Sequence, residues 1–186
     1  MRIIGGARRG LKLADVGEGD AAAHLRPTSD RVREAIFNLL INAHGNPVAG
    51  ARVLDLFAGT GALGLESLSR GASEATFVDD GAKALALIRA NVAKMRAEGE
   101  TQVLRQDVRR LGPNPGGGYG LVFLDPPYGK GLGETALAAA LKGGWLASGA
   151  MVVWEEGSAP PVPEGFALTD QRKYGDTIVT LLKAPE

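Results

Sequence analysis

Apolar residues follow two alternating spacings along most of the chain. Apolar runs of about four to eight residues suit buried strands, and segments in which apolar residues recur every three or four positions suit one face of a helix. The runs predict strands at residues 52–57, 75–78, 101–104, 121–124 and 150–154, and the other segments predict helices at residues 62–69, 83–97 and 134–141. Strands that alternate with helices form a mostly parallel sheet with helices on both faces.

The C-terminal part of the chain predicts an antiparallel pair of strands. Residues 166–172 and 177–182 have strand-like patterns on either side of the turn Tyr174-Gly175-Asp176. A turn of this composition between two such segments is typical of a β-hairpin. The expected fold class is therefore α/β and Rossmann-like, with a mostly parallel seven-stranded sheet that ends in an antiparallel hairpin.

The N-terminal part predicts an extension that precedes the main domain. Residues 1–13 alternate around three glycines, as in a small β-hairpin, and a polar loop follows. Several N-cap candidates lie near Thr28, and apolar residues then recur at helical spacing until about Gly45. We expect residues 1–24 to form a β-hairpin extension with its loop, and residues 25–186 to form the main part of a chain that is one domain overall.

The composition suits a globular protein without metal chemistry. The chain has 186 residues, of which 45% are hydrophobic and 23% charged, so it is long enough for about one domain. It has no cysteine, which excludes disulfides, thiolate catalysis and cysteine zinc sites, and with two histidines a histidine metal centre is not expected. There is no apolar run of about 18 residues that could span a membrane and no signal-peptide pattern, so we expect a cytoplasmic protein.

The charge distribution is uneven although the formal net charge is zero at pH 7. Zero net charge counts against binding nucleic acid by bulk electrostatics. Basic residues nevertheless gather in the first part of the chain: Arg2, Arg8, Arg9, Lys12, Arg26, Arg31 and Arg33. This part of the chain is either a basic face that meets nucleic acid or an ordinary solvated surface.

A glycine-rich loop follows the first predicted strand of the main domain. Gly59, Gly61 and Gly64 match the pattern G-x-G-x-x-G, and Asp79 stands at the end of the next predicted strand. Glycines let the backbone approach a ligand and turn into a helix whose N-terminal amides attract negative charge, and an acid at the next strand end binds ribose hydroxyls. Taken alone, the pattern predicts a nicotinamide or flavin dinucleotide site.

Asp55 favours a different cofactor. It lies before Gly59, at the mouth of the loop, where a carboxylate would repel a pyrophosphate and attract an ammonium or sulfonium group. S-adenosylmethionine carries both of these cations. Asp79 or the adjacent Asp80 is then expected to bind the ribose, and Asp107, at the end of the third strand, the adenine amine. Acids at three successive strand ends fit S-adenosylmethionine well.

The motif Asp125-Pro126-Pro127-Tyr128 suits the methylation of an amine. It follows the predicted strand 121–124, so it falls at the edge where open α/β sheets bind ligands. The two prolines hold the segment extended and remove two N–H donors. The Asp125 carboxylate and the Pro126 carbonyl can accept both hydrogens of an exocyclic base amine, while Tyr128 stacks on the extruded base. The alternative is a plain turn after a strand.

Four segments carry a resemblance to a known family: Arg2-Ile3-Ile4-Gly5-Gly6 with Arg9-Gly10-x-Lys12-Leu13, residues 26–38 (Arg-Pro-Thr-Ser-Asp-Arg-Val-Arg-Glu-Ala-Ile-Phe-Asn), residues 55–71, and Asp125-Pro126-Pro127-Tyr128. Through them nearly the whole chain resembles the small bacterial 16S ribosomal RNA guanine-N2 methyltransferases of the RsmD type. The resemblance implies a class I S-adenosylmethionine-dependent methyltransferase fold. It also implies methylation of one guanine, position 966 of the 16S RNA, during small-subunit assembly, with the protein expected to be a monomer.

Residue chemistry and resemblance together predict the site residues. The catalytic residues are Asp125, Pro126, Pro127 and Tyr128. The cofactor-binding residues are Thr28, Asp55, Phe57, Ala58, Gly59, Gly61, Asp79, Asp80, Asp107, Val108 and Asp125. The RNA-binding residues are Arg8, Arg9, Lys12, Arg26 and Arg31. The chain departs from the family pattern at Leu11, where a basic residue is common, and at Asp79-Asp80, where Glu is more usual, so which aspartate binds the ribose stays open.

Three other functions remain compatible with the sequence. An adenine-N6 methyltransferase of DNA or RNA would share the same chemistry and differ only in substrate. A nicotinamide-dependent dehydrogenase would explain the glycines but would leave Asp55 and Asp125 without a role. A ribosome-assembly factor would bind the small subunit without depending on methylation.

Overall fold

The structure is a computed structural model that describes residues 1–16, 25 and 28–186. Within these residues the helices are α1 (Asp30–Ala43), α2 (Ala62–Ser69), α3 (Ala82–Met95) and α4 (Leu132–Lys142), with short 3-10 helices at Glu98–Glu100 and Val108–Arg110. The strands are β1 (Arg52–Leu56), β2 (Glu74–Asp79), β3 (Thr101–Arg105), β4 (Tyr119–Leu124), β5 (Leu146–Glu156), β6 (Ala167–Tyr174) and β7 (Thr177–Lys183). Every helix and strand predicted for the main domain is present.

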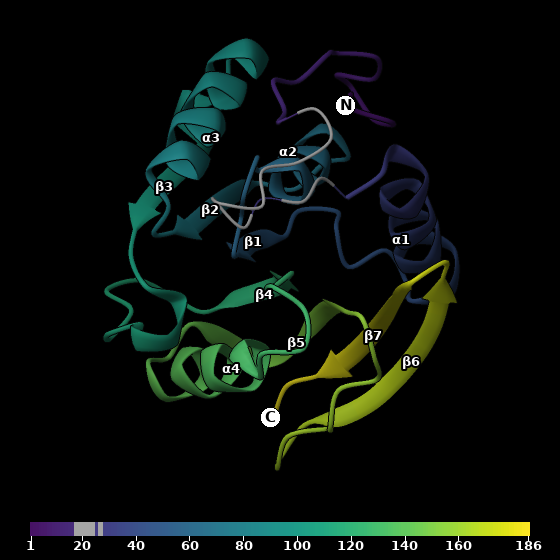
Figure 1. Cartoon of the computed structure of the whole chain (residues 1–186), viewed down its shortest axis with the longest axis vertical. Coiled ribbons are helices and arrows are strands. Elements are labelled where there is room, and N and C mark those ends of the chain that lie inside the picture. The colour runs from purple at the N-terminus through teal and green to yellow at the C-terminus, as the bar shows by residue number, and fades with distance from the viewer. Residues whose placement is uncertain (17–24, 26–27) are drawn as a thin grey trace.

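The strands form one sheet in the order β3-β2-β1-β4-β5-β7-β6 among the described residues (Figure 1). Strands β1 to β5 run parallel, and β7 is antiparallel to both of its neighbours. The predicted class, a mostly parallel seven-stranded sheet with an antiparallel C-terminal hairpin, is confirmed. The chain order reverses between β1 and β4, and ligands of open α/β sheets bind at the carboxyl ends of the strands at such a switch point.

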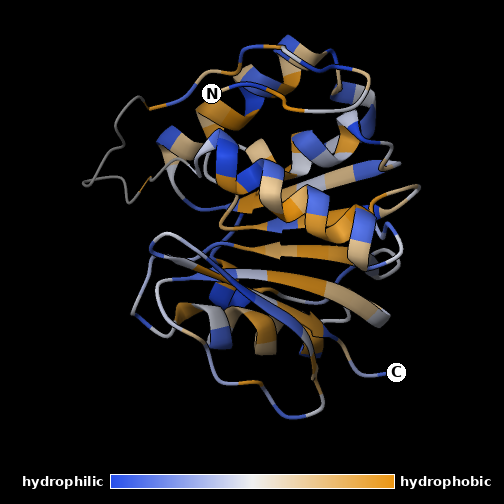
Figure 2. Ribbon diagram, turned by 90° about the vertical axis from the view of Figure 1, so that its right-hand side faces the viewer, coloured by the Kyte–Doolittle hydropathy of each residue, from blue (hydrophilic) through white to orange (hydrophobic). Residues whose placement is uncertain are grey.

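Helices cover both faces of the sheet, which gives three layers (Figure 1). One apolar cluster joins α1, α2 and α3 to the sheet, and a second joins α4 and the 3-10 helix Val108–Arg110 to the opposite face. Most of the strands are largely apolar, whereas β6 at the edge of the sheet is mostly polar (Figure 2). Among the described residues no helix is both long and apolar enough to cross a membrane.

The N-terminal segment is more closely integrated than an extension. Antiparallel pairing is present, because Arg2 and Lys12 form a bridge and Ile3 N donates to Leu11 O over 2.9 Å, although no regular strand forms. Ile3 and Leu13 are completely or almost completely buried, and both belong to the cluster beneath α1 and α2. The segment therefore contributes to the core of the main domain, because its apolar side chains belong to the same buried cluster as those of the helices and the sheet.

Helix α1 begins two residues after Thr28. Ser29 is its N-cap, and the Ser29 side chain accepts a hydrogen bond from the backbone N–H of Val32. The helix packs through a buried stripe that includes Ile36, Phe37 and Leu40. Thr28 itself is left outside the helix, next to the carboxyl ends of the parallel strands.

Candidate active site

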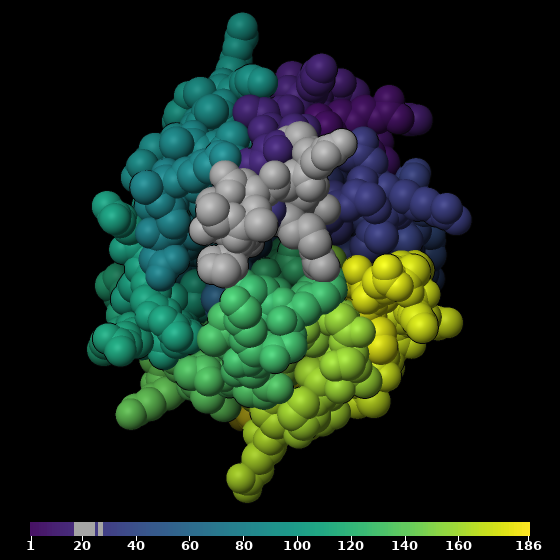
Figure 3. All heavy atoms as spheres, in the orientation of Figure 1, coloured from purple at the N-terminus to yellow at the C-terminus, as the bar shows by residue number. Residues whose placement is uncertain are grey.

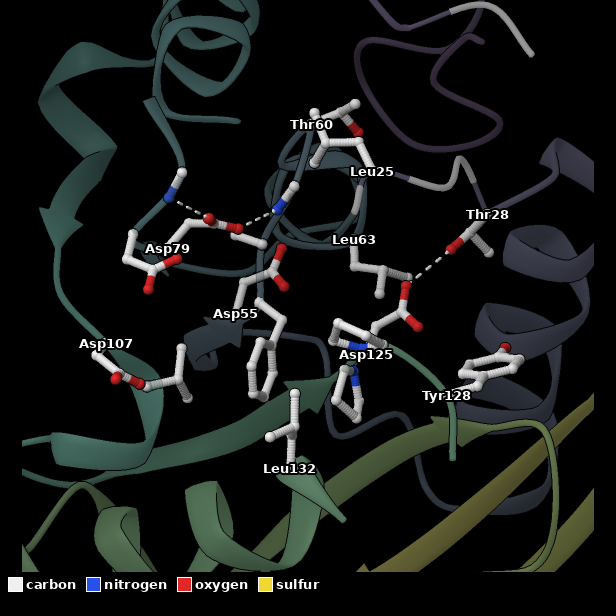
Figure 4. Close-up of a pocket in the computed structure, with 18 of the residues that line it drawn as sticks. Leu25, Thr28, Asp55, Thr60, Leu63, Asp79, Asp107, Asp125, Tyr128 and Leu132 are labelled. Atoms are coloured by element: carbon white, nitrogen blue, oxygen red, sulfur yellow. Dashed lines mark hydrogen bonds between the residues drawn. The ribbon is translucent and has the colours of Figure 1, made fainter. Parts of the chain in front are cut away.

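A cleft of about 710 Å³ opens at the carboxyl ends of the parallel strands, at the switch point between β1 and β4. All the predicted catalytic and cofactor-binding residues except Gly61 line it. Figure 4 shows the carboxylates of Asp55, Asp79 and Asp125 around this one space. The structure therefore brings together side chains from four predicted strand ends.

The glycine-rich loop turns from β1 into α2 beneath the cleft. Gly59 and Gly61 have φ angles of 58° and 77°, a region that favours glycine, and Gly61 is the N-cap of α2. A Cβ atom on Gly64 would lie 2.4 Å from the Phe77 ring, so this position needs glycine for close packing of helix against strand. Gly61 thus shapes the loop, although it does not line the cleft.

Asp55 was predicted to lie at the mouth of the glycine-rich loop, but it lies deeper, at the base of the cleft. Asp55 is 1% exposed, and one oxygen of its carboxylate accepts a hydrogen bond from Gly64 N over 3.0 Å. Burial raises its pKa well above the usual value. The Gly64 hydrogen bond opposes this shift, and repulsion from Asp125 and Asp79 adds to it. The sequence correctly places Asp55 near the end of β1, but its depth depends on α2 packing over β1.

Asp79 is held rigidly at the end of β2. One of its carboxylate oxygens accepts from Gly59 N over 3.0 Å, and the other accepts from Gly81 N over 2.9 Å. Burial raises the pKa of Asp79 while these hydrogen bonds lower it. Asp80 is exposed on the rim of the same cleft. Two backbone hydrogen bonds make Asp79 the better-ordered of the two acceptors.

Asp107 lines the far end of the cleft beside the buried Val108. Its carboxylate accepts from the backbone N–H of Arg109 over 3.0 Å and from the Arg109 guanidinium over 2.9 and 2.8 Å. The hydrogen bond from the Arg109 side chain lowers the pKa of Asp107. An adenine amine at Asp107 would therefore share this carboxylate with Arg109, a partner that the sequence reasoning missed.

Asp125 follows β4 and faces the cleft, with Pro126 buried behind it. The Thr28 hydroxyl donates to one Asp125 carboxylate oxygen over 3.3 Å (Figure 4). Asp125 N donates to Leu56 O over 3.4 Å, which ties the motif to the end of β1. The carboxylate that was predicted to accept an amine thus stands beside Asp55 in the cleft.

Tyr128 is positioned by residues that no sequence motif indicated. Its hydroxyl shares a hydrogen bond of 3.0 Å with the Thr177 hydroxyl at the start of β7. Glu156, at the end of β5, accepts from Gly129 N over 2.9 Å and from Gly157 N over 3.0 Å. These contacts hold the loop after the two prolines against the C-terminal half of the sheet.

Gly157→Ala is expected to lower catalytic turnover about tenfold, because its new Cβ would lie 2.9 Å from Cδ2 of Tyr128 and would push the ring out of place. A displacement of about 1 Å can cost up to about 100-fold in rate. Gly120→Ala is the matched control, because nothing lies within 4 Å of its Cβ position. Steady-state turnover of both variants checks this, and equal rates would show that the ring position is not critical.

The predicted RNA-binding residues that the structure describes do not line the cleft. Arg9, Lys12 and Arg31 are exposed, whereas Arg8 forms an ion pair of 3.1 Å with Glu100. Arg26 lies outside the described residues.

In the space-filling view, α1, the loop after β4 and the β6–β7 hairpin lie next to one another on one face (Figure 3).

Further cleft residues were not predicted from the sequence: Leu25, Thr60, Ala62, Leu63, Gly81, Arg109, Lys130 and Leu132. Lys130 is exposed and follows Tyr128 by two residues, so its proximity to the motif was the one available signal. Thr60, Ala62 and Leu63 occupy the variable positions of the glycine-rich pattern, whereas Leu25 and Leu132 reach the cleft from separate parts of the chain.

Comparisons with known proteins identify relatives over the whole chain. The family described as "Conserved hypothetical protein 95" matches residues 1–183. Ribosomal RNA small subunit methyltransferase D of Escherichia coli (strain K12) is 38% identical over 185 residues, which cover 97% of this chain and 88% of that relative. The putative rRNA methyltransferase YlbH of Bacillus subtilis (strain 168) is 34% identical over 189 residues, which cover 98% of each chain.

A solved structure shares the whole fold. The putative methyltransferase yhhF from Escherichia coli matches with a TM-score of 0.83 and 35% sequence identity, over 100% of this chain and 98% of that one. Because the family match spans nearly all residues, and relatives above 30% identity cover both chains almost completely, the chain belongs to the RsmD-type methyltransferase family that is described as conserved hypothetical protein 95.

Proposed function

We propose that the protein uses S-adenosylmethionine to methylate the exocyclic N2 amine of a guanine in 16S ribosomal RNA, at the position corresponding to 966, within the small ribosomal subunit. The observation that carries the proposal is the Asp125 carboxylate, which faces one cleft together with Asp55 and Asp79. The names of the Escherichia coli and Bacillus subtilis relatives support ribosomal RNA as the substrate. Guanine N2 rests on the resemblance of the N-terminal segment (residues 2–13) and of residues 26–38 to the family.

The cleft fits a cationic cofactor. Asp55, Asp79 and Asp125 face the same space, and both Asp125 and Asp79 raise the pKa of Asp55 by repulsion. A ligand with an ammonium and a sulfonium group would relieve this repulsion, whereas a pyrophosphate would increase it. Asp79 would accept from the ribose hydroxyls, because its two backbone hydrogen bonds leave further lone pairs on the carboxylate. When bound, S-adenosylmethionine supplies an electrophilic methyl group.

The residues after β4 would prepare the base amine. An exocyclic amine has its lone pair delocalised into the ring, so it attacks well only when its N–H bonds are held and the nitrogen pyramidalises. Asp125 and the Pro126 carbonyl would accept the two N–H groups. The Asp125 carboxylate would then stabilise the positive charge that develops on nitrogen and take the proton.

Tyr128 would bind the base itself. Its hydroxyl is anchored to Thr177, so its ring is held at the side of the cleft next to Asp125 (Figure 4). An aromatic ring in this place suits stacking on an extruded base. The exposed Arg9, Lys12 and Arg31 would contact phosphates outside the cleft.

Asp55→Asn is expected to weaken binding of S-adenosylmethionine by about tenfold or more, which corresponds to about 1.4 kcal/mol. The substitution removes a negative charge from the carboxylate-lined site that would bind the cationic groups of the cofactor. Asparagine retains an oxygen that can accept from Gly64 N. Isothermal titration of both proteins with the cofactor measures the difference, and unchanged affinity would remove Asp55 from the cofactor site.

The same substitution is expected to change how stability depends on pH. Folding raises the pKa of Asp55, so ionisation disfavours the folded state, and this penalty grows as pH rises above the unfolded pKa. The stability of Asp55→Asn relative to the unsubstituted protein should therefore increase from pH 4 to pH 7.5. Urea denaturation at both values checks this, and a difference that did not change with pH would contradict it.

The proposed function is tested by transfer of a radiolabelled methyl group from S-adenosylmethionine. Assembled small subunits, naked 16S RNA and duplex DNA are the parallel acceptors, and the labelled nucleoside is identified after digestion. We expect label in N2-methylguanosine from the small subunit. Label in adenine, or in DNA, would refute the guanine assignment and support the adenine-N6 alternative.

A further inference from the structure

The segment that precedes α1 contacts the amine-accepting carboxylate directly. The Thr28 hydroxyl donates to Oδ2 of Asp125 over 3.3 Å, although the two residues are 97 positions apart in the chain. Thr28 and Asp125 both line the cleft, and Figure 4 shows them facing each other across its edge. The sequence motif that includes Thr28 therefore reaches the reaction site through this side chain.

The position of Thr28 is set by the start of α1. Ser29 caps the helix, which fixes the backbone immediately after Thr28. The Arg33 guanidinium also reaches the Thr28 carbonyl in a long hydrogen bond of 3.5 Å. Arg33 is completely buried, so its guanidinium is a fixed anchor and not a mobile surface group.

Arg33 is itself held by charged groups from two elements. It forms an ion pair of 2.8 Å with Asp30 and lies 3.6 Å from the buried Glu66 carboxylate of α2. It also donates to the Arg2 carbonyl in the N-terminal segment. Thr28 therefore lies at the end of a buried polar network that joins the N-terminal segment, α1 and α2.

We propose that Thr28 is a positioning residue for methyl transfer, and that its hydroxyl holds the Asp125 carboxylate in the orientation that accepts the base amine. This inference rests on the proposed function. A carboxylate can rotate about its Cβ–Cγ bond, and a hydrogen bond to one oxygen restricts that rotation. Thr28 then acts on the chemical step through Asp125, in contrast to a residue whose main contact is the cofactor.

Thr28→Val tests this role, because valine keeps the shape of threonine and removes the donor. Hydrogen bonds to charged groups contribute enough to change a rate about 10- to 100-fold, and we expect kcat to fall by that factor. The KM for the small subunit and the Kd for S-adenosylmethionine should stay within about twofold. Thr28→Ser restores the hydroxyl and should restore most of the turnover.

Three results would overturn the inference. The first is an unchanged kcat and an unchanged cofactor Kd in Thr28→Val. The second is an unchanged kcat with a higher cofactor Kd, which would make Thr28 a cofactor contact. The third is a Thr28→Ser protein that is as impaired as Thr28→Val. Thr101→Val is the control, because it loses a threonine hydrogen bond of 2.9 Å, to the Ala97 carbonyl, outside the cleft. If the Thr28→Val protein does not fold, Thr28→Ala takes its place in the same comparison.

The same assay separates this inference from the proposed function. The unsubstituted protein is measured beside the variants on small subunits. If it transfers no methyl group, the proposed function fails, whereas an active protein whose Thr28→Val variant is equally active refutes only the role of Thr28. Cofactor titration of each variant shows that the site is folded.

Discussion

Asp125→Asn is expected to slow methyl transfer by about 100- to 1,000-fold, a far larger effect than its effect on the Kd for S-adenosylmethionine. Asparagine has nearly the same shape as aspartate. It lacks the negative charge that would stabilise the developing ammonium and receive its proton. Because Asp125 stands at the end of β4, beside the Thr28 hydroxyl, the loss should fall on the chemical step.

Single-turnover methyl transfer with saturating cofactor measures this effect, and isothermal titration gives the cofactor affinity. Asp176→Asn is the matched control, because Asp176 is exposed between β6 and β7 and does not line the cleft. Near-full turnover in Asp125→Asn would refute the amine-accepting role. A large loss of cofactor affinity would instead assign Asp125 mainly to the cofactor.

Glu66→Ala is expected to lower the free energy of unfolding by about 3–5 kcal/mol, because it removes the fully buried carboxylate beside the buried Arg33 and leaves that cation only its partly exposed partner Asp30. Glu66 and Arg33 are both completely buried, 3.6 Å apart, and Arg70 also pairs with Glu66 over 2.7 Å. The same carboxylate accepts from Ile4 N and Gly5 N, each over 2.9 Å. One side chain thus stabilises two arginines and the N-terminal segment.

Urea denaturation checks this prediction, with Glu74→Ala as the control. Glu74 forms an ion pair of 2.6 Å with Arg52, but both side chains are more than one third exposed, so its removal should cost about 1 kcal/mol or less. Faster hydrogen exchange at the Ile4 and Gly5 amides should accompany the loss in Glu66→Ala. Equal stability losses in the two variants would contradict the importance of burial.

The fold and the general location of the site could be predicted from the sequence. The apolar runs mark the central strands β1, β2 and β4 because burial on both faces requires apolar side chains, a property of each segment by itself. Short connections through helices make the strands parallel, so their carboxyl ends meet at one edge of the sheet. Asp55, Asp79 and Asp125 were therefore correctly predicted to lie together.

The depth and partners of these residues could not be predicted in the same way. Asp55 was expected at an open mouth but is buried under α2, and the Asp107 carboxylate pairs with Arg109. Whether a carboxylate is exposed depends on the elements that pack over it. A one-dimensional pattern records the period of a helix but not its distance from a neighbouring strand.

The sequence by itself determined the alternation of strands and helices, the glycine-rich turn and the acids at the strand ends, because each depends on neighbouring residues. Only the tertiary structure decided that Thr28 meets Asp125, that Tyr128 meets Thr177, and that Ile3 and Leu13 belong to the core. The two hydroxyl contacts join residues 97 and 49 positions apart. Such contacts exist only after separate elements have packed, since no local spacing encodes the distance between them.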